Sequence, residues 1–180
     1  MDYLHTLRLT TLLIPFLLLT ACANDPNRRT PGVVIDDFAL ENIVESEIRK
    51  SDTGYKGSHI VVVSHNGVVL LAGQVATEAL RENASTVAQG LRRVRKVHNE
   101  LTVGGPTSML ARSNDAWLTT KVKTRLVAGE ADGTKIKVQT EDSTVYLMGM
   151  VTRAQADAAI NVAKDVYGVQ KIVKVFEYLD

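Results

Sequence analysis

VVLLAGQV, at residues 68–75, is the stretch that decides the fold, because a second version of it, TVYLMGMV, occupies residues 144–151. Both stretches consist mainly of residues that favour β-strands, and both place a glycine two positions before a final valine. A segment that recurs in this way within one chain indicates an internal duplication. The sequence therefore predicts two copies of one folding unit, each built around one of these strands.

Apolar landmarks on both sides of these strands keep the same order in the two copies. Residues spaced by four precede the strands, as expected for the buried stripe of a helix. The matched pairs, with the first copy named first, are Leu40 and Leu118, Val44 and Val122, Ile48 and Leu126, Ile60 and Ile136, Val62 and Val138, Ala88 and Ala163, Val94 and Val169, Val97 and Ile172, and Leu101 and Phe176.

Each copy has the element order helix, strand, strand, helix, strand. The Asn-Gly pair at 66–67 is a strong signal for a two-residue hairpin turn, and the Asp-Ser pair at 142–143 is a weaker one. Thr77 and Thr152 can cap the second helix of each copy. Because the strand that follows this helix must be parallel to the strand before it, the sheet is mixed. We expect an α/β (α+β) fold of two tandem domains, each an αββαβ two-layer sandwich with a mixed three-stranded sheet and both helices on one face.

The first helix of the second copy, Asp115–Val127, holds the only tryptophan of the chain and three closely spaced basic residues, Lys121, Lys123 and Arg125. Ser113, Asn114 or Asp115 can cap its start, and Gly129 can end it. Its buried stripe consists of Leu118, Val122 and Leu126.

At about 100° per residue, Trp117 lies roughly 140° from the centre of that stripe and faces away from the core. An aromatic ring with an aliphatic neighbour and flanking cations suits a membrane interface, where the cations meet lipid phosphates. Packing of Trp117 against the first copy is the alternative, and the lysines could simply form a solvated helix face. The predicted lipid-binding residues are Trp117, Thr120, Lys121, Lys123, Thr124, Arg125 and Val127.

The duplication provides an internal comparison for this face. The two helices agree in their buried residues and differ on their outward faces, so the fold alone does not require the tryptophan or the cations. The first copy, with an acidic face, is a poor candidate for an anionic membrane and a better one for packing against the second copy or holding a protein partner. The exchanged positions are Ala39 for Trp117, Glu45 for Lys123, Glu47 for Arg125 and Arg49 for Val127.

The N-terminus predicts a lipoprotein signal. Arg8 precedes an apolar run at 9–19 that has the length of a secretory signal and is short for a membrane span. The residues at 19–22, Leu-Thr-Ala-Cys, resemble a bacterial lipobox, in which the cysteine is diacylated before cleavage. Cys22 is the only cysteine, which excludes an intramolecular disulfide. The alternative is an ordinary signal peptide that happens to contain a cysteine.

The strand ending in Gly-x-Val, the Ala-rich helix and Gly168-Val169 before a final strand resemble the BON domain, and two such domains behind a lipobox resemble the dual-BON outer-membrane lipoproteins. Arg93 departs from the family pattern, since it stands where the second copy has Gly168. The predicted organisation is a signal peptide at 1–21, a lipidated Cys22 with a tether at 22–35, a first BON domain at 36–103, a linker at 104–112 and a second BON domain at 113–180.

The resemblance implies a lipid-anchored protein of the outer membrane that faces the periplasm, and Ala23 after Cys22 favours that destination. It also implies binding of anionic phospholipid, phosphatidylglycerol or cardiolipin, through the first helix of the second domain. A role in outer-membrane integrity and at division sites follows from the same resemblance. The alternative is a periplasmic adaptor whose Trp117 face docks on an envelope protein.

Other classes of function find little support. The chain has 21 Lys and Arg against 20 Asp and Glu, a balance that argues against a nucleic-acid-binding protein. His59, His65 and His98 have no metal-ligand spacing, and no nucleophile elbow or phosphate-binding loop is present. We therefore expect no catalytic residue, no metal and no cofactor, and a protein that is not an enzyme.

Overall fold

The computed structural model describes residues 29–129 and 132–179. The predicted signal peptide and the predicted lipid-attachment residue Cys22 lie outside these residues. The first domain opens with a long helix and ends with a strand at the sheet edge. Its elements are α2 (Pro31–Ser51), β1 (His59–His65), β2 (Val68–Val75), α3 (Glu78–Gln89) and β3 (Lys96–Val103), with a short 3-10 turn η2 (Thr53–Tyr55) after α2.

The second domain repeats this order element by element. Within the described part of the chain, no helix is long and apolar enough to span a membrane. The elements are α4 (Met109–Ala128), the 3-10 turn η3 (Gly133–Lys135), β4 (Ile136–Glu141), β5 (Thr144–Val151), α5 (Arg153–Lys164) and β6 (Lys171–Tyr178).

Both sheets have the predicted mixed topology. The strand orders are β1-β2-β3 and β4-β5-β6, and in each sheet the central strand is antiparallel to the first and parallel to the third. The hairpin turns at 66–67 and 142–143 have positive φ at both residues, as a type I′ turn requires. Thr77 and Thr152 cap α3 and α5 as expected, and Gln155 completes a capping box at the start of α5. The predicted αββαβ fold is confirmed in both copies.

The glycine of each Gly-x-Val pattern is required by close contact with the neighbouring strand. A Cβ atom on Gly73 would lie 2.1 Å from the carbonyl oxygen of His59, and one on Gly149 would lie 2.6 Å from that of Lys135. Gly73 also has φ +113°, which favours glycine. This contact explains why the two stretches share a glycine at the same position.

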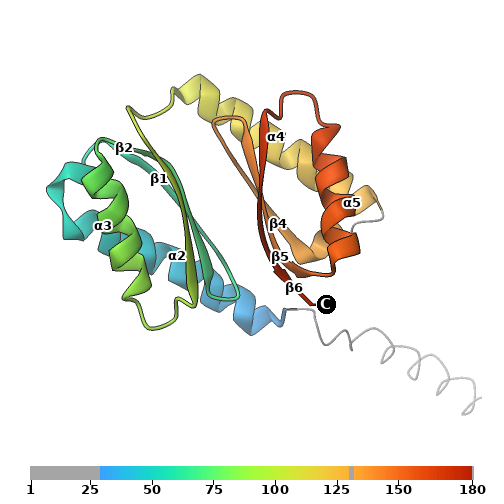
Figure 1. The fold of residues 1–180 in the computed structure, drawn as a ribbon, viewed down its shortest axis with the longest axis horizontal. Helices are drawn as coiled ribbons and strands as arrows, with labels where there is room; N and C mark the ends of the chain where they lie inside the picture. Colours follow the sequence, from blue (N-terminus) through green and yellow to red (C-terminus); the bar gives the residue numbers. More distant parts are fainter. Residues whose placement is uncertain (1–28, 130–131, 180) are drawn as a thin grey trace, which may run out of the picture.

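The helices of each domain cover one face of its sheet, and small residues let α3 and α5 lie close to it. Ala84 and Ala88 of α3 and Ala159 and Ala163 of α5 are fully buried. The opposite faces of the two sheets pack against each other, so that the helices form the outer layers of the molecule (Figure 1). The apolar contact between the sheets, here termed the interdomain cluster, consists of Val63, Val68, Leu70, Ala72, Tyr146, Met148 and Val175, with Val61 and Val173 at its edge.

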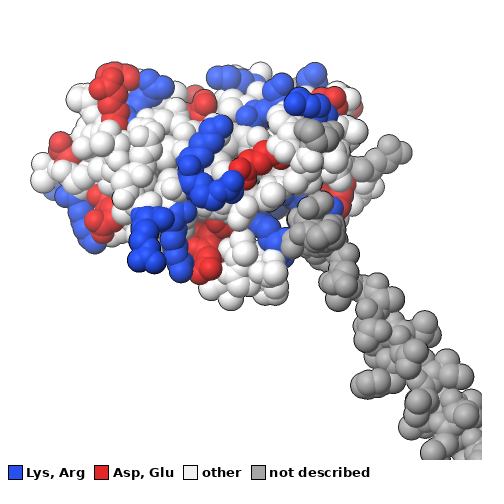
Figure 2. Space-filling model, turned by 60° about the horizontal axis from the view of Figure 1, so that its bottom comes forward, with Lys and Arg blue, Asp and Glu red and all other residues white. Residues whose placement is uncertain are grey.

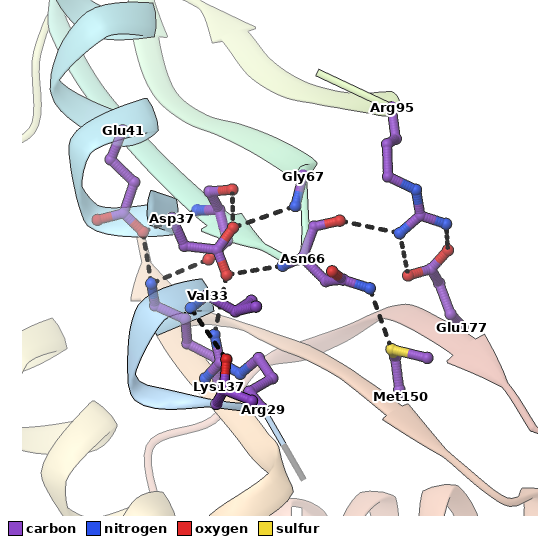
Figure 3. Close-up of polar contacts among 12 residues, drawn as sticks. Arg29, Val33, Asp37, Glu41, Asn66, Gly67, Arg95, Lys137, Met150 and Glu177 are labelled. Atoms are coloured by element: carbon purple, nitrogen blue, oxygen red, sulfur yellow. Dashed lines mark hydrogen bonds and ion pairs between the residues drawn. The ribbon is translucent and has the colours of Figure 1, made fainter. Parts of the chain in front are cut away.

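Polar contacts join the two domains at the edge of this interface that lies near the start of α2 (Figure 3). The Arg95 guanidinium binds both carboxylate oxygens of Glu177, at 2.8 and 3.1 Å. Lys137 of β4 donates to the Glu41 carboxylate and, at 3.1 Å, to the Ser64 carbonyl oxygen. Each contact joins one domain to the other, so the two domains are held in one relative position.

A buried carboxylate joins the two domains at the opposite edge of their interface. Glu141, at the end of β4, accepts hydrogen bonds from the Gln74 side-chain amide at 2.9 Å and from the Thr107 hydroxyl at 3.3 Å. The His59 imidazole lies 3.1 Å from the other Glu141 oxygen. The Glu141 side chain therefore joins the first sheet and the linker to the second domain.

Two helices begin earlier than the sequence predicts. Ser108 caps α4, so this helix starts at Met109 and the expected linker at 104–112 is shorter. The predicted caps Ser113, Asn114 and Asp115 lie inside the helix. Thr30 caps α2, which starts at Pro31, so the last residues of the expected tether at 22–35 are helical. Gly129 ends α4, as predicted.

Two histidines at the domain interface, His65 and His98, predict a pH-dependent stability. His65 is buried, and burial, followed by the Arg29 charge, lowers its pKa to about 4. Burial also lowers the pKa of His98, which pairs with Leu70 of the interdomain cluster. In the unfolded chain a histidine has a pKa of about 6.5, so between pH 6.5 and 4 the unfolded state binds more protons.

The free energy of unfolding should therefore fall as the pH drops through this window, by on the order of 3 kcal/mol from His65 alone. Urea unfolding measured from pH 7 to pH 4 checks this, with His65→Gln as the comparison. The variant should lose most of the slope. An equal slope in both proteins would contradict the assignment.

Candidate functional site

The candidate site lies on α4, whose inner face is fixed by the core. Leu118, Val122 and Leu126 are fully buried against the second sheet, as predicted. Their spacing of four turns the opposite face of the helix outward. Packing against the core therefore sets the position and the rotation of α4 without any ligand.

Asp115 gives α4 a second, polar attachment that the sequence reading missed. Its buried carboxylate accepts the backbone N–H groups of Asp142 and Ser143, both at 2.9 Å, and so binds the helix to the β4–β5 turn. In the first domain Asp37 plays the same part for the turn at 66–67. Burial acts to raise the pKa of Asp37, but hydrogen bonds from Asn66, Ser64 and Gly67 lower it overall. The signal was present in the sequence, because both aspartates precede the matched leucines by three residues.

Trp117, two residues after this attachment, is 53% exposed. The Lys121 ammonium lies 4.3 Å from the centroid of its ring, which is the distance of a cation–π contact. Trp117 is absent from the interdomain cluster. This ring therefore takes no part in the apolar contact between the two sheets.

The middle of the outward face is formed by residues that offer few free polar groups. The hydroxyls of Thr120 and Thr124 donate to the carbonyl oxygens of Ala116 and Thr120, at 3.0 and 2.9 Å. Val127, one turn further along, is 61% exposed. The face thus combines an aromatic ring, an aliphatic side chain and hydroxyl groups whose protons are already engaged.

The cations lie on two different sides of this face. Lys121 and Arg125 lie on the side of α5, where the Arg125 guanidinium donates to the carbonyl oxygen of Asp165 at 2.8 Å. Lys123 lies on the other side, toward the first domain. The structure therefore brings Trp117 and Lys121 together, anchors Arg125 to the end of α5, and places Lys123 separately.

On the side of Lys123, the molecule has a groove of about 750 Å³ between the two domains. Thr124 and Val127 of α4 form one wall, and Val34 and Phe38 of α2 form the other. Figure 2 shows the face with the start of α2 brought forward, where uncharged side chains lie beside the first described residues and charges of both signs are interspersed. The sequence reading placed none of the α2 residues in a site.

The described residues, 29–129 and 132–179, contain no group of three or more His, Cys, Asp or Glu residues that could hold a metal ion. The three histidines serve the domain interface instead. His59 contacts Glu141, while His65 and His98 lie among buried side chains of the first sheet. The expectation that the protein is not an enzyme stays a prediction.

Comparison with known proteins gives the family. The BON domain matches residues 36–105 and again residues 114–180. The chain belongs to the BON-domain family. Each match covers most of one of the two αββαβ units, and the second includes α4 from residue 114 onward, with all seven predicted lipid-binding residues.

Three known proteins align with most of this chain. Outer membrane lipoprotein DolP of Haemophilus influenzae is 43% identical over 159 residues, which cover 88% of this chain and 81% of the relative. The 21 kDa hemolysin of Actinobacillus pleuropneumoniae is 39% identical, with 84% of this chain and 78% of the relative covered. Osmotically-inducible protein Y of Escherichia coli is 32% identical, with 82% and 75% covered. The likeness to DolP supports a BON-domain lipoprotein of the outer membrane.

The attachment of α4 by Asp115 can be tested directly. Asp115→Ala leaves two backbone N–H groups of the turn without their charged acceptor, which should lower the free energy of unfolding by about 2–4 kcal/mol. Urea unfolding measures this loss. Asp157→Ala, on the surface of α5, is the matched control and should change stability by less than about 0.5 kcal/mol. Equal stability of Asp115→Ala and wild type would contradict the role of this carboxylate.

Proposed function

We propose that this protein is held at the outer membrane by acyl chains on Cys22, faces the periplasm, and binds anionic phospholipid through the outward face of α4. Phosphatidylglycerol and cardiolipin are the proposed lipids, and support of outer-membrane integrity, including at division sites, is the proposed role. The observation that carries the proposal is the half-exposed Trp117 ring with the Lys121 ammonium 4.3 Å from its centre. A ring and a cation in this arrangement suit the headgroup region of a bilayer.

The duplicated helix supports a ligand role for this face. In α2, Ala39 takes the place of Trp117, and the acids Glu45 and Glu47 pair with Arg49 and Lys50 of the same helix. The same fold therefore forms without an exposed aromatic residue at this position. Trp117 exposes apolar surface that the domain does not need for folding, which is a property of binding sites.

The expected free energy of membrane binding by α4 explains why an anchor is needed. Each cation near an anionic surface contributes about 1 kcal/mol, so Lys121, Lys123 and Arg125 give about 3 kcal/mol. Half-burying a tryptophan adds about 2–3 kcal/mol at ~25 cal/mol per Å². The sum corresponds to a dissociation constant of about 0.1 mM, which is weak for a protein in free solution. A lipid anchor at Cys22 would hold α4 near the bilayer at high effective concentration, so that the acyl chains anchor and the helix selects the lipid.

The second candidate function is a periplasmic adaptor that uses the same face to dock on an envelope protein. The exposed Trp117 also favours this reading, because tryptophan is enriched among residues that dominate protein interfaces. The two functions differ in their dependence on lipid charge and on salt, since only the membrane reading requires anionic headgroups.

Sedimentation with lipid vesicles tests the proposal. The protein starting at Ala23 lacks the acyl chains, so any binding must come from the fold. Wild type should sediment with vesicles containing phosphatidylglycerol or cardiolipin and not with phosphatidylcholine alone, and added salt should weaken the binding. Trp117→Ala and the Lys121→Glu/Lys123→Glu double variant should each reduce binding at least fivefold while remaining folded.

Asp157→Lys is the matched control, because it adds a cation on α5 without touching the α4 face. Added to Trp117→Ala or to the Lys121→Glu/Lys123→Glu double variant, Asp157→Lys should not restore vesicle binding. If wild type ignores every vesicle but binds an envelope protein in the absence of lipid, the adaptor function replaces the proposed one.

A further inference from the structure

The start of α2 exposes apolar side chains that the fold does not use. Ile35 and Phe38 are 68% and 67% exposed, and Val34 beside them is partly exposed. All three follow the N-cap Thr30 within the first turns of the helix. The buried stripe of α2 begins only at Asp37 and Leu40, so these apolar residues are not part of the core.

The carboxylates at the start of α2 are matched by cations. Asp36 pairs with Arg93 at 2.9 Å, and Asp37 pairs with Arg29 at 3.0 Å. Glu41 pairs with Lys137 of the second domain (Figure 3). The surface around Val34 and Phe38 is therefore largely neutralised, and an anionic membrane would not be repelled by unpaired carboxylates there.

The groove next to these residues joins them to the face of α4. Val34 and Phe38 form its first wall, and Thr124 and Val127, which also belong to the Trp117 face, form the second. Lys123 lies on its lining and makes no ion pair with any residue in the described ranges. A volume of about 750 Å³ falls within the range of sites that hold small organic ligands.

We propose that this groove takes one acyl chain of an anionic phospholipid from the membrane, with the phosphate at Lys123, so that α2 is a second membrane contact. The inference rests on the proposed function and extends it to the first domain. Three observations select a lipid as the occupant. The groove is apolar and continuous with the α4 face, its free cation suits a phosphate, and Thr30 follows Cys22 by eight residues (30 − 22).

Eight extended residues span at most about 29 Å, so an anchor at Cys22 would keep the start of α2 close to the bilayer surface. An acyl chain of the anchor itself is a less suitable occupant, because a chain held in the groove is withdrawn from the membrane. The test below uses protein without acyl chains, so only membrane lipid can fill the groove.

Tryptophan fluorescence tests the groove, since Trp117 is the only tryptophan of the chain. The protein starting at Ala23 carries an N-terminal His tag and is held on vesicles by a nickel-chelating lipid, which replaces the anchor in every sample. The vesicles contain brominated acyl chains at one fixed fraction, carried either by phosphatidylglycerol mixed with unlabelled phosphatidylcholine or by phosphatidylcholine in vesicles without phosphatidylglycerol. Phe38→Trp/Trp117→Phe reports on the groove, and Leu110→Trp/Trp117→Phe is the control, because Leu110 is 81% exposed at the other end of α4.

We expect the bromines to quench the Phe38→Trp variant at least twofold more than the Leu110→Trp control, only when phosphatidylglycerol is present. Adding Lys123→Gln should remove most of this difference. Wild-type Trp117 reports separately on the proposed function. Quenching of Trp117 without quenching of the Phe38→Trp variant overturns the groove and leaves the proposed function standing. Quenching of neither overturns both, and equal quenching without phosphatidylglycerol overturns the selection of an anionic lipid by the groove.

Discussion

Face-to-face packing of the two sheets is the constraint on which the rest of the molecule depends. A three-stranded sheet with helices on one face leaves its other face bare, and an apolar face of this size must be covered. Here the bare faces cover each other through Leu70, Tyr146, Met148 and their neighbours. The helices α2, α3, α4 and α5 are thereby directed outward (Figure 1), and the start of α2 is brought beside the end of α4. The exposed face of α4 and the groove beside it both follow from this arrangement.

The duplication separates what folding requires from what the surface is free to change. Asp37 and Asp115 bind equivalent hairpin turns with the same pattern of backbone hydrogen bonds, and the buried stripes of α2 and α4 match residue by residue. The outward faces have diverged, with Ala39 in one and Trp117 in the other. A chain that belongs to the BON-domain family can therefore keep one fold in both copies while the outward faces of their first helices differ.

Much of the fold could be predicted because its signals are local. Hairpin turns, threonine caps and four-residue spacings depend on neighbouring residues, and the duplication showed each of them twice. The docking of the sheets is a long-range feature that joins segments far apart in the chain, and it leaves every residue of Val68–Val75 buried. The sequence correctly oriented Trp117 outward. It could not place Arg125 on Asp165 or Phe38 in a groove with Val127, because these contacts join segments far apart in the chain.

The most direct test of the account replaces the outward face of α4 with that of α2, through Trp117→Ala, Lys123→Glu, Arg125→Glu and Val127→Arg in one protein. Vesicle binding and urea unfolding are then measured together. Because the sister helix carries these residues in the same fold, the account predicts a free energy of unfolding within about 1 kcal/mol of wild type and at least a tenfold loss of binding to anionic vesicles. Undiminished binding by the folded variant would contradict the claim that this face of α4 selects the lipid.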